Sequence, residues 1–383
     1  MSKVRFINQT VAAVATLAGT IIGVGLFSLP YIANKVGIWT MLFYFVFLGT
    51  VMIIITLMYG EITLRTKTIH RLPGYVEKYL GSRWKKVSFV TNIAGLSGAI
   101  LAYLIVGGGF LYSLLNPIFG GSNFVYVLIF FIAGAILIYF GIRGIAQTEL
   151  LLLVVFFVIL ALIFVRGFSM INMDYLFNFD FHYIFLPYGA VLFSLGGLSL
   201  IPEVKEMLVS DQSKLKKVIP ISILIAAVAY LVFTFVILGL TGAQTSTNAI
   251  SGLKMVFGNG LVVMAFALGI LTTFTSFIAL GLTLKKIFWY DMHLKKNLSW
   301  VLACFIPFVA FLSGFKDFIA VVGLTGGALL GIDITLIIFA YFKAKKNGDK
   351  VPSYSLSLPR LITYSLIFLF VLGIIYQVWY FVR

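Results

Sequence analysis

Long apolar stretches, separated by short polar loops, follow one another along the chain. Eleven of them have roughly 20 residues or more, the length that an α-helix needs to cross about 30 Å of hydrocarbon. They lie near residues 8–35, 38–64, 86–115, 123–142, 146–168, 184–208, 218–242, 257–290, 297–314, 318–342 and 359–382. We therefore expect an all-α, polytopic membrane protein with about eleven transmembrane helices. A shorter segment, 72–81, has proline near its start and glycine at its end, which is typical of a short interfacial helix.

Two of the predicted helices contain residues that interrupt regular helical hydrogen bonding. In the first, Gly23 and Gly25 precede Pro30, and in the sixth, Gly196 and Gly197 follow one another. Glycine weakens a helix and proline lacks an N–H, so backbone groups near these residues need other partners. Lipid offers none, which restricts such groups to the protein interior or to a water-filled cavity. Paired breaks in two halves of a chain point to a binding site near the membrane midplane.

The positions of the two breaks also predict an internal repeat. The first repeat covers about residues 8–168 and the second about 184–345, each with five segments and each beginning with a broken helix. Because five is odd, the second repeat would be inverted in the membrane relative to the first. The remaining helix, about 359–382, is an addition to a single transmembrane domain that spans residues 1–383.

Composition and charge agree with a membrane protein and argue against a nucleic-acid-binding one. The chain is 61% hydrophobic and 10% charged, yet its net charge is +16. The predicted topology places all but five of the 28 lysines and arginines in loops on one side. The positive-inside rule makes that side cytoplasmic, with a cytoplasmic amino terminus, in an inner or plasma membrane. The charge thus reflects topology, and we expect no nucleic-acid partner.

Enzyme chemistry finds no support in the sequence. The three histidines, His70, His182 and His293, are far apart and fall in loops, so no zinc-binding helix of the HExxH type exists. No G-x-S-x-G motif is present. Cys304 is the single cysteine, which excludes a disulfide within the chain. We expect neither an enzyme nor a cofactor other than a coupling ion.

At the two breaks the chain resembles a known family. The matching residues are Gly19-Thr20-x-x-Gly23-x-Gly25-x-x-x-Leu29-Pro30 with Gly37, then Leu72-Pro73-Gly74-Tyr75 with Tyr79-Leu80-Gly81, and the stretch from Phe193 to Glu203. This pattern is similar to that of the amino acid/auxin permease group of the APC superfamily, which includes bacterial tyrosine and tryptophan permeases and sodium-coupled neutral amino acid transporters. The resemblance implies a LeuT-like fold with 5+5 inverted repeats and broken helices 1 and 6. It also implies a secondary transporter that imports an amino acid with a proton or sodium ion by alternating access.

A different class of function stays open beside this one. The same fold could serve a membrane receptor subunit that senses an amino acid without transporting it. Either protein would have an amino acid and membrane lipid as partners, and the sequence does not fix the oligomeric state.

The breaks themselves are the predicted substrate site. Exposed N–H groups at Gly23, Val24 and Gly25 suit a carboxylate, while free carbonyls at the second break suit an ammonium group. The alternative is that the first glycines only let helices pack closely and that the second pair only lets a helix bend. Tyr103, near the centre of the third segment, would cover the substrate or else pack against neighbours. The predicted substrate-binding residues are Gly19, Thr20, Gly23, Val24, Gly25, Tyr103, Phe193, Ser194, Gly196 and Gly197.

Two features suggest where an ion could couple. Asp333 lies ten residues from Lys343, about 15 Å along a helix, and hence near the midplane, where an ionisable residue is a functional hypothesis by default. Asp333 would carry a proton or act as a gating partner; the alternative is a structural acid that is hydrogen-bonded to neighbouring helices. In the eighth segment, hydroxyls would form a sodium site if, as the resemblance implies, this helix packs beside the first; otherwise they bond to their own helix. The cluster is Thr272, Thr273, Thr275 and Ser276, with the possible sodium near Ile22, Thr272 and Ser276.

Three acids lie near the predicted inner edge of the membrane. Glu61 precedes Arg65 by four residues, a spacing that predicts an ion pair on the surface. Glu203 and Glu206 would gate the cytoplasmic exit or lie at a solvated helix end.

Overall fold

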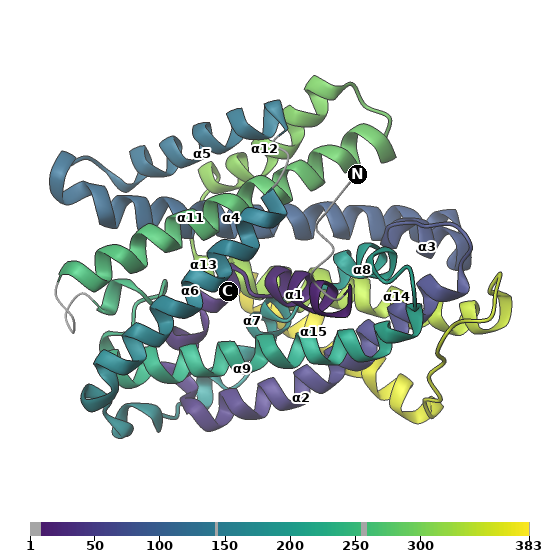
Figure 1. The fold of residues 1–383 in the computed structure, drawn as a ribbon, viewed down its shortest axis with the longest axis horizontal. Helices are drawn as coiled ribbons and strands as arrows, with labels where there is room; N and C mark the ends of the chain where they lie inside the picture. The colour runs from purple at the N-terminus through teal and green to yellow at the C-terminus, as the bar shows by residue number, and fades with distance from the viewer. Residues whose placement is uncertain (1–8, 142–144, 254–258, 383) are drawn as a thin grey trace.

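The computed structural model describes residues 9–141, 145–253 and 259–382, and all regular structure in these ranges is helical (Figure 1). The helices are α1 (Gln9–Ile21), α2 (Leu29–Arg65), α3 (Leu72–Leu80), α4 (Ser82–Phe119), α5 (Asn123–Phe140), α6 (Ile145–Gly167), α7 (Pro187–Ser194), α8 (Ile201–Met207), α9 (Leu215–Thr241), α11 (Asn259–Lys286), α12 (Lys296–Leu312), α13 (Phe318–Leu324), α14 (Leu330–Asn347) and α15 (Arg360–Val382). Short 3-10 turns, η1 (Val24–Phe27) and η5 (Leu198–Leu200), follow α1 and α7, and a π-helical turn, η10 (Thr325–Leu329), joins α13 to α14.

The predicted multi-pass helical architecture is confirmed. Over the described ranges, eight helical spans are long and apolar enough to cross a membrane; one of them joins α7 to α8 and another joins α13 to α14. Three shorter apolar helices overlap the first, fifth and ninth predicted segments. The first and second predicted segments meet inside α2 at Gly37, whose φ of +77° is non-helical. A side chain at Gly37 would also lie only 2.6 Å from the carbonyl oxygen of Asn178, so this bend requires glycine.

Both predicted breaks are present. Helix α1 ends at Ile21, and the chain resumes helical geometry only in η1 and α2. Helix α7 ends at Ser194, and α8 begins after η5. A third irregularity, η10, was not predicted. It packs on α7 so closely that a side chain at Gly326 would overlap the carbonyl oxygen of Gly189.

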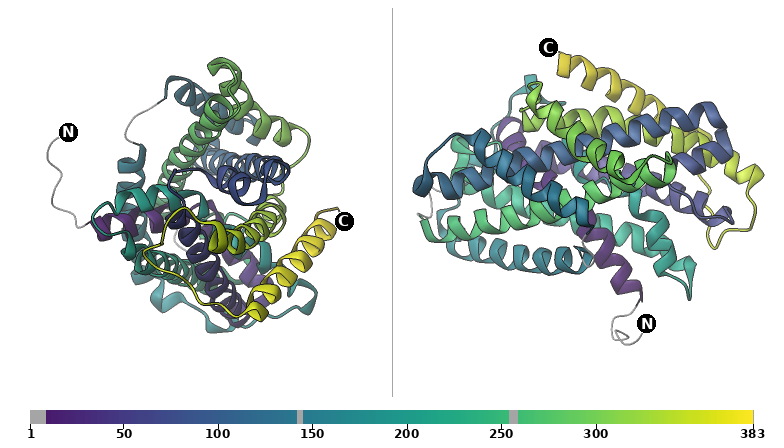
Figure 2. Two further views of the ribbon diagram at one scale, coloured as in Figure 1. Left: turned by 90° about the vertical axis from the view of Figure 1, so that its right-hand side faces the viewer. Right: turned by 90° about the horizontal axis from the view of Figure 1, so that it is seen from above.

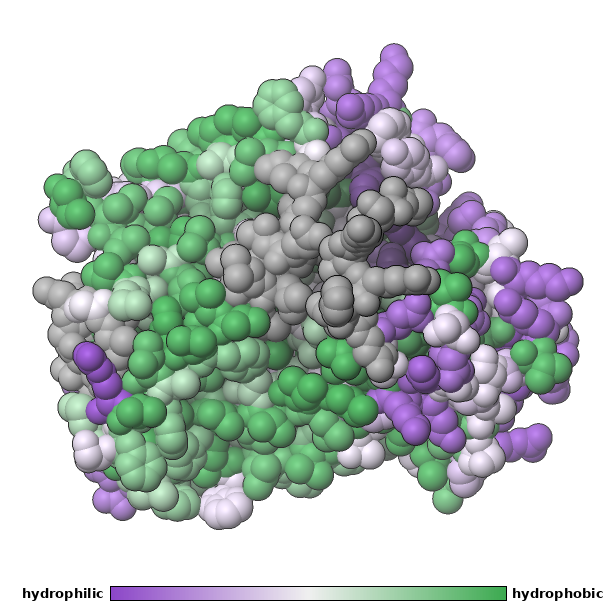
Figure 3. All heavy atoms as spheres, viewed as in Figure 1, coloured by the Kyte–Doolittle hydropathy of each residue, from purple (hydrophilic) through white to green (hydrophobic). Residues whose placement is uncertain are grey.

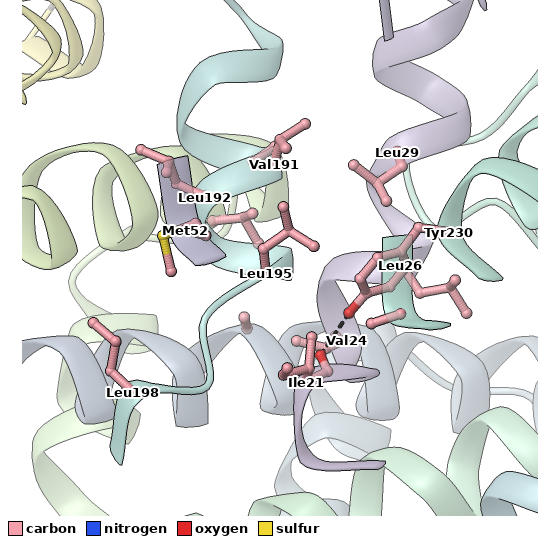
Figure 4. Packing of buried hydrophobic residues seen from close by; sticks show 14 of the residues in the cluster. Ile21, Val24, Leu26, Leu29, Met52, Val191, Leu192, Leu195, Leu198 and Tyr230 are labelled. Carbon is pink, nitrogen blue, oxygen red and sulfur yellow. Dashed lines mark hydrogen bonds between the residues drawn. The ribbon is translucent and has the colours of Figure 1, made fainter. Parts of the chain in front are cut away.

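The breaks lie in the middle of the helix bundle. Helix α9 packs along α2 and α1, whereas α4 packs along α11 and α5 (Figure 1, Figure 2). Buried apolar side chains from α2, α7, α9 and the first break surround both discontinuities (Figure 4). The core therefore holds irregular backbone at a fixed place among regular helices.

The surface is divided into an apolar body and a polar end. Large apolar side chains face outward along α2, with Trp39 66%, Phe43 61% and Val46 62% exposed. Figure 3 shows hydrophilic residues gathered at the end of the molecule that carries α3 and α8. A wide apolar exterior is what lipid covers. Residues 1–8, with Lys3 and Arg5, lie outside the described ranges, so the cytoplasmic amino terminus stays a prediction.

Residues 348–359, between α14 and α15, form a strap that is fastened to the polar end. Tyr354 donates its hydroxyl hydrogen to the carbonyl oxygen of Leu57 at 2.8 Å. At the start of the strap, hydrogen bonds from the Lys67 N–H and from Lys78 hold the pKa of Asp349 below its usual value. The strap thus closes over the carboxyl-terminal end of α2.

The expectation of a surface ion pair at Glu61 is wrong. Its side chain is fully buried and accepts hydrogen bonds from Arg65 Nε at 2.8 Å, Ser355 Oγ at 2.9 Å and the Leu356 N–H at 2.7 Å. The spacing of four residues correctly predicted the pair. It could not reveal the strap that covers it.

Candidate functional site

A cavity of about 190 Å³ lies where the two breaks meet. One wall comes from the breaks, and the other comes from α4, η10 and α14. Its lining residues are Thr20, Ile21, Gly23, Val24, Gly25, Leu72, Thr91, Asn92, Gly95, Leu96, Ala99, Tyr103, Phe193, Ser194, Gly196, Leu198, Ser199, Leu280, Thr325, Gly326, Leu329, Leu330 and Asp333.

Tyrosine hydroxyls meet the backbone of the first break. The Gly23 N–H donates to Tyr230 Oη and the Val24 N–H donates to Tyr103 Oη, each at 3.2 Å. A side chain at Gly23 would overlap the Tyr103 hydroxyl, so the approach needs glycine. Tyr103 lines the cavity, whereas Tyr230 does not. The first break therefore has one tyrosine in front of it and one behind it.

The two breaks touch each other at Gly25 and Ser194. A methyl group on Gly25 would overlap Ser194 Oγ and would lie 3.1 Å from both Ser194 Cα and Phe193 Cδ1. The Ser194 hydroxyl donates to the carbonyl oxygen of Ala190 at 2.8 Å, while the Ser194 carbonyl accepts from Tyr230 at 3.0 Å. The geometry leaves no spare space at this contact between Gly25 and Ser194.

Asp333 lies in the same cavity. Its side chain is buried and accepts a hydrogen bond from the Thr91 hydroxyl at 2.5 Å. Among the described residues, no basic group forms an ion pair with it. An acid without a countercharge in such a place is costly when ionised. It is therefore suited to hold a proton or to attract a cation.

The wall that faces the breaks is a face of α4 with small residues. Asn92, Gly95, Leu96 and Ala99 follow the spacing of one helix face. A methyl group placed on Gly95 would meet nothing within 4 Å. This wall therefore leaves open space for an apolar group, with Thr91 and Asn92 as polar neighbours.

The hydroxyl cluster of α11 does not line the cavity. Thr272, Thr273 and Thr275 each donate to carbonyl oxygens one turn back in α11, and neither they nor Ser276 line the cavity. Helix α11 packs mainly on α4 and α6 rather than on α1. Ile22 lies in the first break, between α1 and η1, and does not line the cavity. The sodium site near Ile22, Thr272 and Ser276 stays a prediction.

A second cavity, of about 480 Å³, lies beside the first at the polar end. Asn92 lines both, so we call the second one the vestibule. Glu203 and Glu206 line it, and Arg71 pairs with Asp291 across it at 3.3 Å. Beside them, burial and then Lys78 lower the pKa of His70 below its usual value. The vestibule therefore adjoins the cavity at Asn92 and has several charged residues in its lining.

Aromatic side chains pack together around Phe27, at the end of η1. Phe27 contacts Phe110 edge to face at 5.0 Å between ring centroids and contacts Phe233 at 6.1 Å. Phe266 lies against Phe110 at 5.8 Å. All four are buried. This buried cluster fills the space next to η1, and none of its four rings lines the vestibule.

Most of the predicted substrate-binding residues lie together. Eight of the ten line the cavity, and Gly19 and Gly197 do not. The sequence reasoning missed Thr91, Gly95 and Tyr230, which the fold brings to the breaks from α4 and α9. The adjacent glycines at 326 and 327 were the one signal that could have indicated η10.

The comparisons give the family and the fold. The sequence matches the tryptophan/tyrosine permease family over residues 7–379. None of the curated proteins matches it. Among solved structures, MhsT in complex with L-phenylalanine is similar with a TM-score of 0.67 and 15% identity, covering 96% of this chain and 98% of that one.

Two structures of Mhp1, a nucleobase-cation-symport-1 family transporter, are also similar. The closed form with bromovinylhydantoin bound has a TM-score of 0.61 and 13% identity, covering 85% of this chain and 76% of that one. The inward-facing form has a TM-score of 0.61 and 14% identity, covering 85% and 75%. These neighbours are LeuT-fold transporters, so the expected LeuT-like fold is confirmed.

Proposed function

The chain belongs to the tryptophan/tyrosine permease family, and from this membership and its cavity we propose that it imports an aromatic amino acid by proton symport. It is a multi-pass secondary transporter of amino acids or similar substrates. The observation that carries the finer proposal is the meeting of both breaks with Asp333 in one cavity. Placement within the amino acid/auxin permease group is part of the same proposal.

The substrate zwitterion would bind along the breaks. The N–H groups of Val24 and Gly25 and the Tyr103 hydroxyl would be donors for the carboxylate, and carbonyls of Phe193, Ser194 and Gly196 would be acceptors for the ammonium group. The Gly23 N–H stays bonded to Tyr230. Tyr103 would release the Val24 N–H or share the carboxylate with it. A charged acceptor makes a stronger hydrogen bond than a tyrosine oxygen does, which favours this exchange.

The substrate side chain would lie against α4. Open space at Gly95 and the small Ala99 leave room for a ring, and Thr91 and Asn92 offer partners for a polar ring atom. The family name and the L-phenylalanine bound to MhsT support an aromatic side chain.

Asp333 would couple transport to protons. It is the buried acid of the cavity, it has no basic partner among the described residues, and it lies next to the substrate. The alternative, a sodium ion near Ile22, Thr272 and Ser276, has less support because the threonine hydroxyls of α11 bond to their own helix.

We assign the vestibule to the cytoplasmic side. The polar, basic end of the molecule carries it, and the positive-inside rule places such an end in the cytoplasm. The aromatic cluster around Phe27 would then be the outer closure. Alternating access would move the repeats, about 8–168 and 184–345, against one another in an inner or plasma membrane.

Uptake into proteoliposomes tests the proposal. Labelled phenylalanine, tyrosine and tryptophan are supplied with an inward proton gradient in one set and an inward sodium gradient in another. We expect accumulation with the proton gradient that disappears when an uncoupler collapses it. Accumulation that needs sodium would move the coupling away from Asp333. Binding without accumulation under either gradient would favour the receptor that senses an amino acid.

A further inference from the structure

The hydroxyl of Tyr230 joins the two broken helices. Tyr230 is fully buried in the middle of α9. Its hydroxyl lies 2.6 Å from the Ile21 carbonyl oxygen (Figure 4). It also lies 3.0 Å from the Ser194 carbonyl oxygen and accepts from the Gly23 N–H at 3.2 Å. Three backbone groups, from segments far apart in the sequence, thus meet at one oxygen atom.

These are groups that helix ends leave without helical partners. The last carbonyls of α1 and α7 and the first N–H groups after a break have no intrahelical bond. A phenol can donate one hydrogen bond and accept two. The Tyr230 hydrogen is shared between two carbonyls, and its oxygen accepts from the third group. One side chain therefore satisfies both breaks at once.

Tyr230 does this from behind the substrate cavity. Its side chain is not among the lining residues, whereas Ile21, Gly23 and Ser194, which it holds, all are. The ring is fixed by Phe45, at 6.0 Å between centroids, and by the packing of α9 on α1 and α2. A rigid support outside the cavity can set the spacing of groups inside it.

We propose that Tyr230 is a positioning residue, which holds the carboxylate-binding and ammonium-binding halves of the site at their working distance. The inference rests on the proposed function, because it assumes that the substrate binds between the breaks. Since a neutral hydroxyl satisfies both carbonyls, the substrate meets a site that is already assembled. Without the hydroxyl, binding has to order two segments that are no longer joined.

The test compares Tyr230→Phe with Tyr354→Phe. Tyr354 is also buried and donates its hydroxyl hydrogen to a backbone carbonyl, but it lies in the strap, away from the breaks. Each variant loses a buried hydroxyl that donates to a backbone carbonyl, and Tyr230→Phe also removes the contacts with two further backbone groups. Dissociation constants of labelled phenylalanine, tyrosine and tryptophan, and thermal unfolding, are measured for the purified wild type and both variants.

We expect Tyr230→Phe to raise the dissociation constant about tenfold or more, because buried backbone groups lose their partner. KM should rise by a similar factor, and the maximal uptake rate should change less. Tyr354→Phe should lower thermal stability but leave the dissociation constant unchanged. Equal affinity in Tyr230→Phe and wild type would overturn the inference. Absence of binding in the wild type would instead contradict the proposed function.

A second variant covers the case in which Tyr230→Phe does not fold. Para-aminophenylalanine at position 230 keeps N–H donors at the place of the hydroxyl, so it should retain affinity within about threefold. A folded protein with this residue and no measurable binding would also contradict the positioning role.

Discussion

Gly25→Ala is the substitution that tests the contact between the two breaks. The added methyl group would overlap Ser194 Oγ and lie 3.1 Å from Ser194 Cα and from Phe193 Cδ1. The serine hydroxyl cannot turn away freely, because it is bonded to the Ala190 carbonyl at 2.8 Å. The second break therefore has to move outward by a few tenths of an ångström.

The size of the effect follows from this crowding. One extra methyl group in a tightly packed site costs about 1–3 kcal/mol. If the breaks separate and the ligand has to close them, the dissociation constant rises by roughly 5- to 150-fold. Helical propensity acts in the other direction, since alanine favours helix over glycine, so the protein should remain folded.

The assay is equilibrium binding of labelled phenylalanine, tyrosine and tryptophan to purified protein, with Gly109→Ala as the matched control. Gly109 is also helical, lies outside the cavity, and has nothing within 4 Å of an added methyl group. We expect its affinity to equal that of the wild type. Unchanged affinity in Gly25→Ala, with normal folding, would refute the view that substrate binds between the breaks.

Three further predictions concern the acid, the wall and the strap. Asp333→Asn should abolish proton-driven accumulation. Moving one proton across 100 mV releases about 2.3 kcal/mol, which supports an accumulation of about 50-fold. Unchanged accumulation in the variant would make Asp333 structural. Gly95→Leu should lower the ratio of phenylalanine to alanine uptake by at least about tenfold, because it fills open space in the wall; an unaltered ratio would place the side chain elsewhere. Glu61→Ala leaves the mostly buried Arg65 without its charged partner, so it should lower the free energy of unfolding by about 3 kcal/mol and lower the thermal midpoint. An unshifted midpoint would contradict the buried network.

The sequence predicted the parts of the fold that depend on local chemistry. Apolar length set the helices, and the glycines at positions 23, 25 and 196 marked the breaks, because a broken helix inside lipid is costly wherever it occurs. The spacing of ten residues between Asp333 and Lys343 also predicts that Asp333 lies near the midplane. The LeuT-like arrangement came from the resemblance rather than from these patterns.

What the sequence did not reveal depends on distant packing. Tyr230 is one of 19 tyrosines, and nothing in its neighbourhood distinguishes it; only the packing of α9 on α1 brings its hydroxyl to the breaks. Gly95 likewise matters because its helix happens to face the cavity. The burial of Glu61 depends on a strap almost 300 residues away in the chain. The hydroxyls of α11 show the opposite case, in which a suggestive cluster bonds to its own helix.

A structure of the protein with phenylalanine or tryptophan bound tests the central claim most directly. We expect an amino acid in the cavity, with its carboxylate within hydrogen-bond distance of the Val24 and Gly25 N–H groups and its ring against Gly95. An amino acid bound in the vestibule instead, between Arg71 and Asp291, with the cavity unchanged, would contradict it.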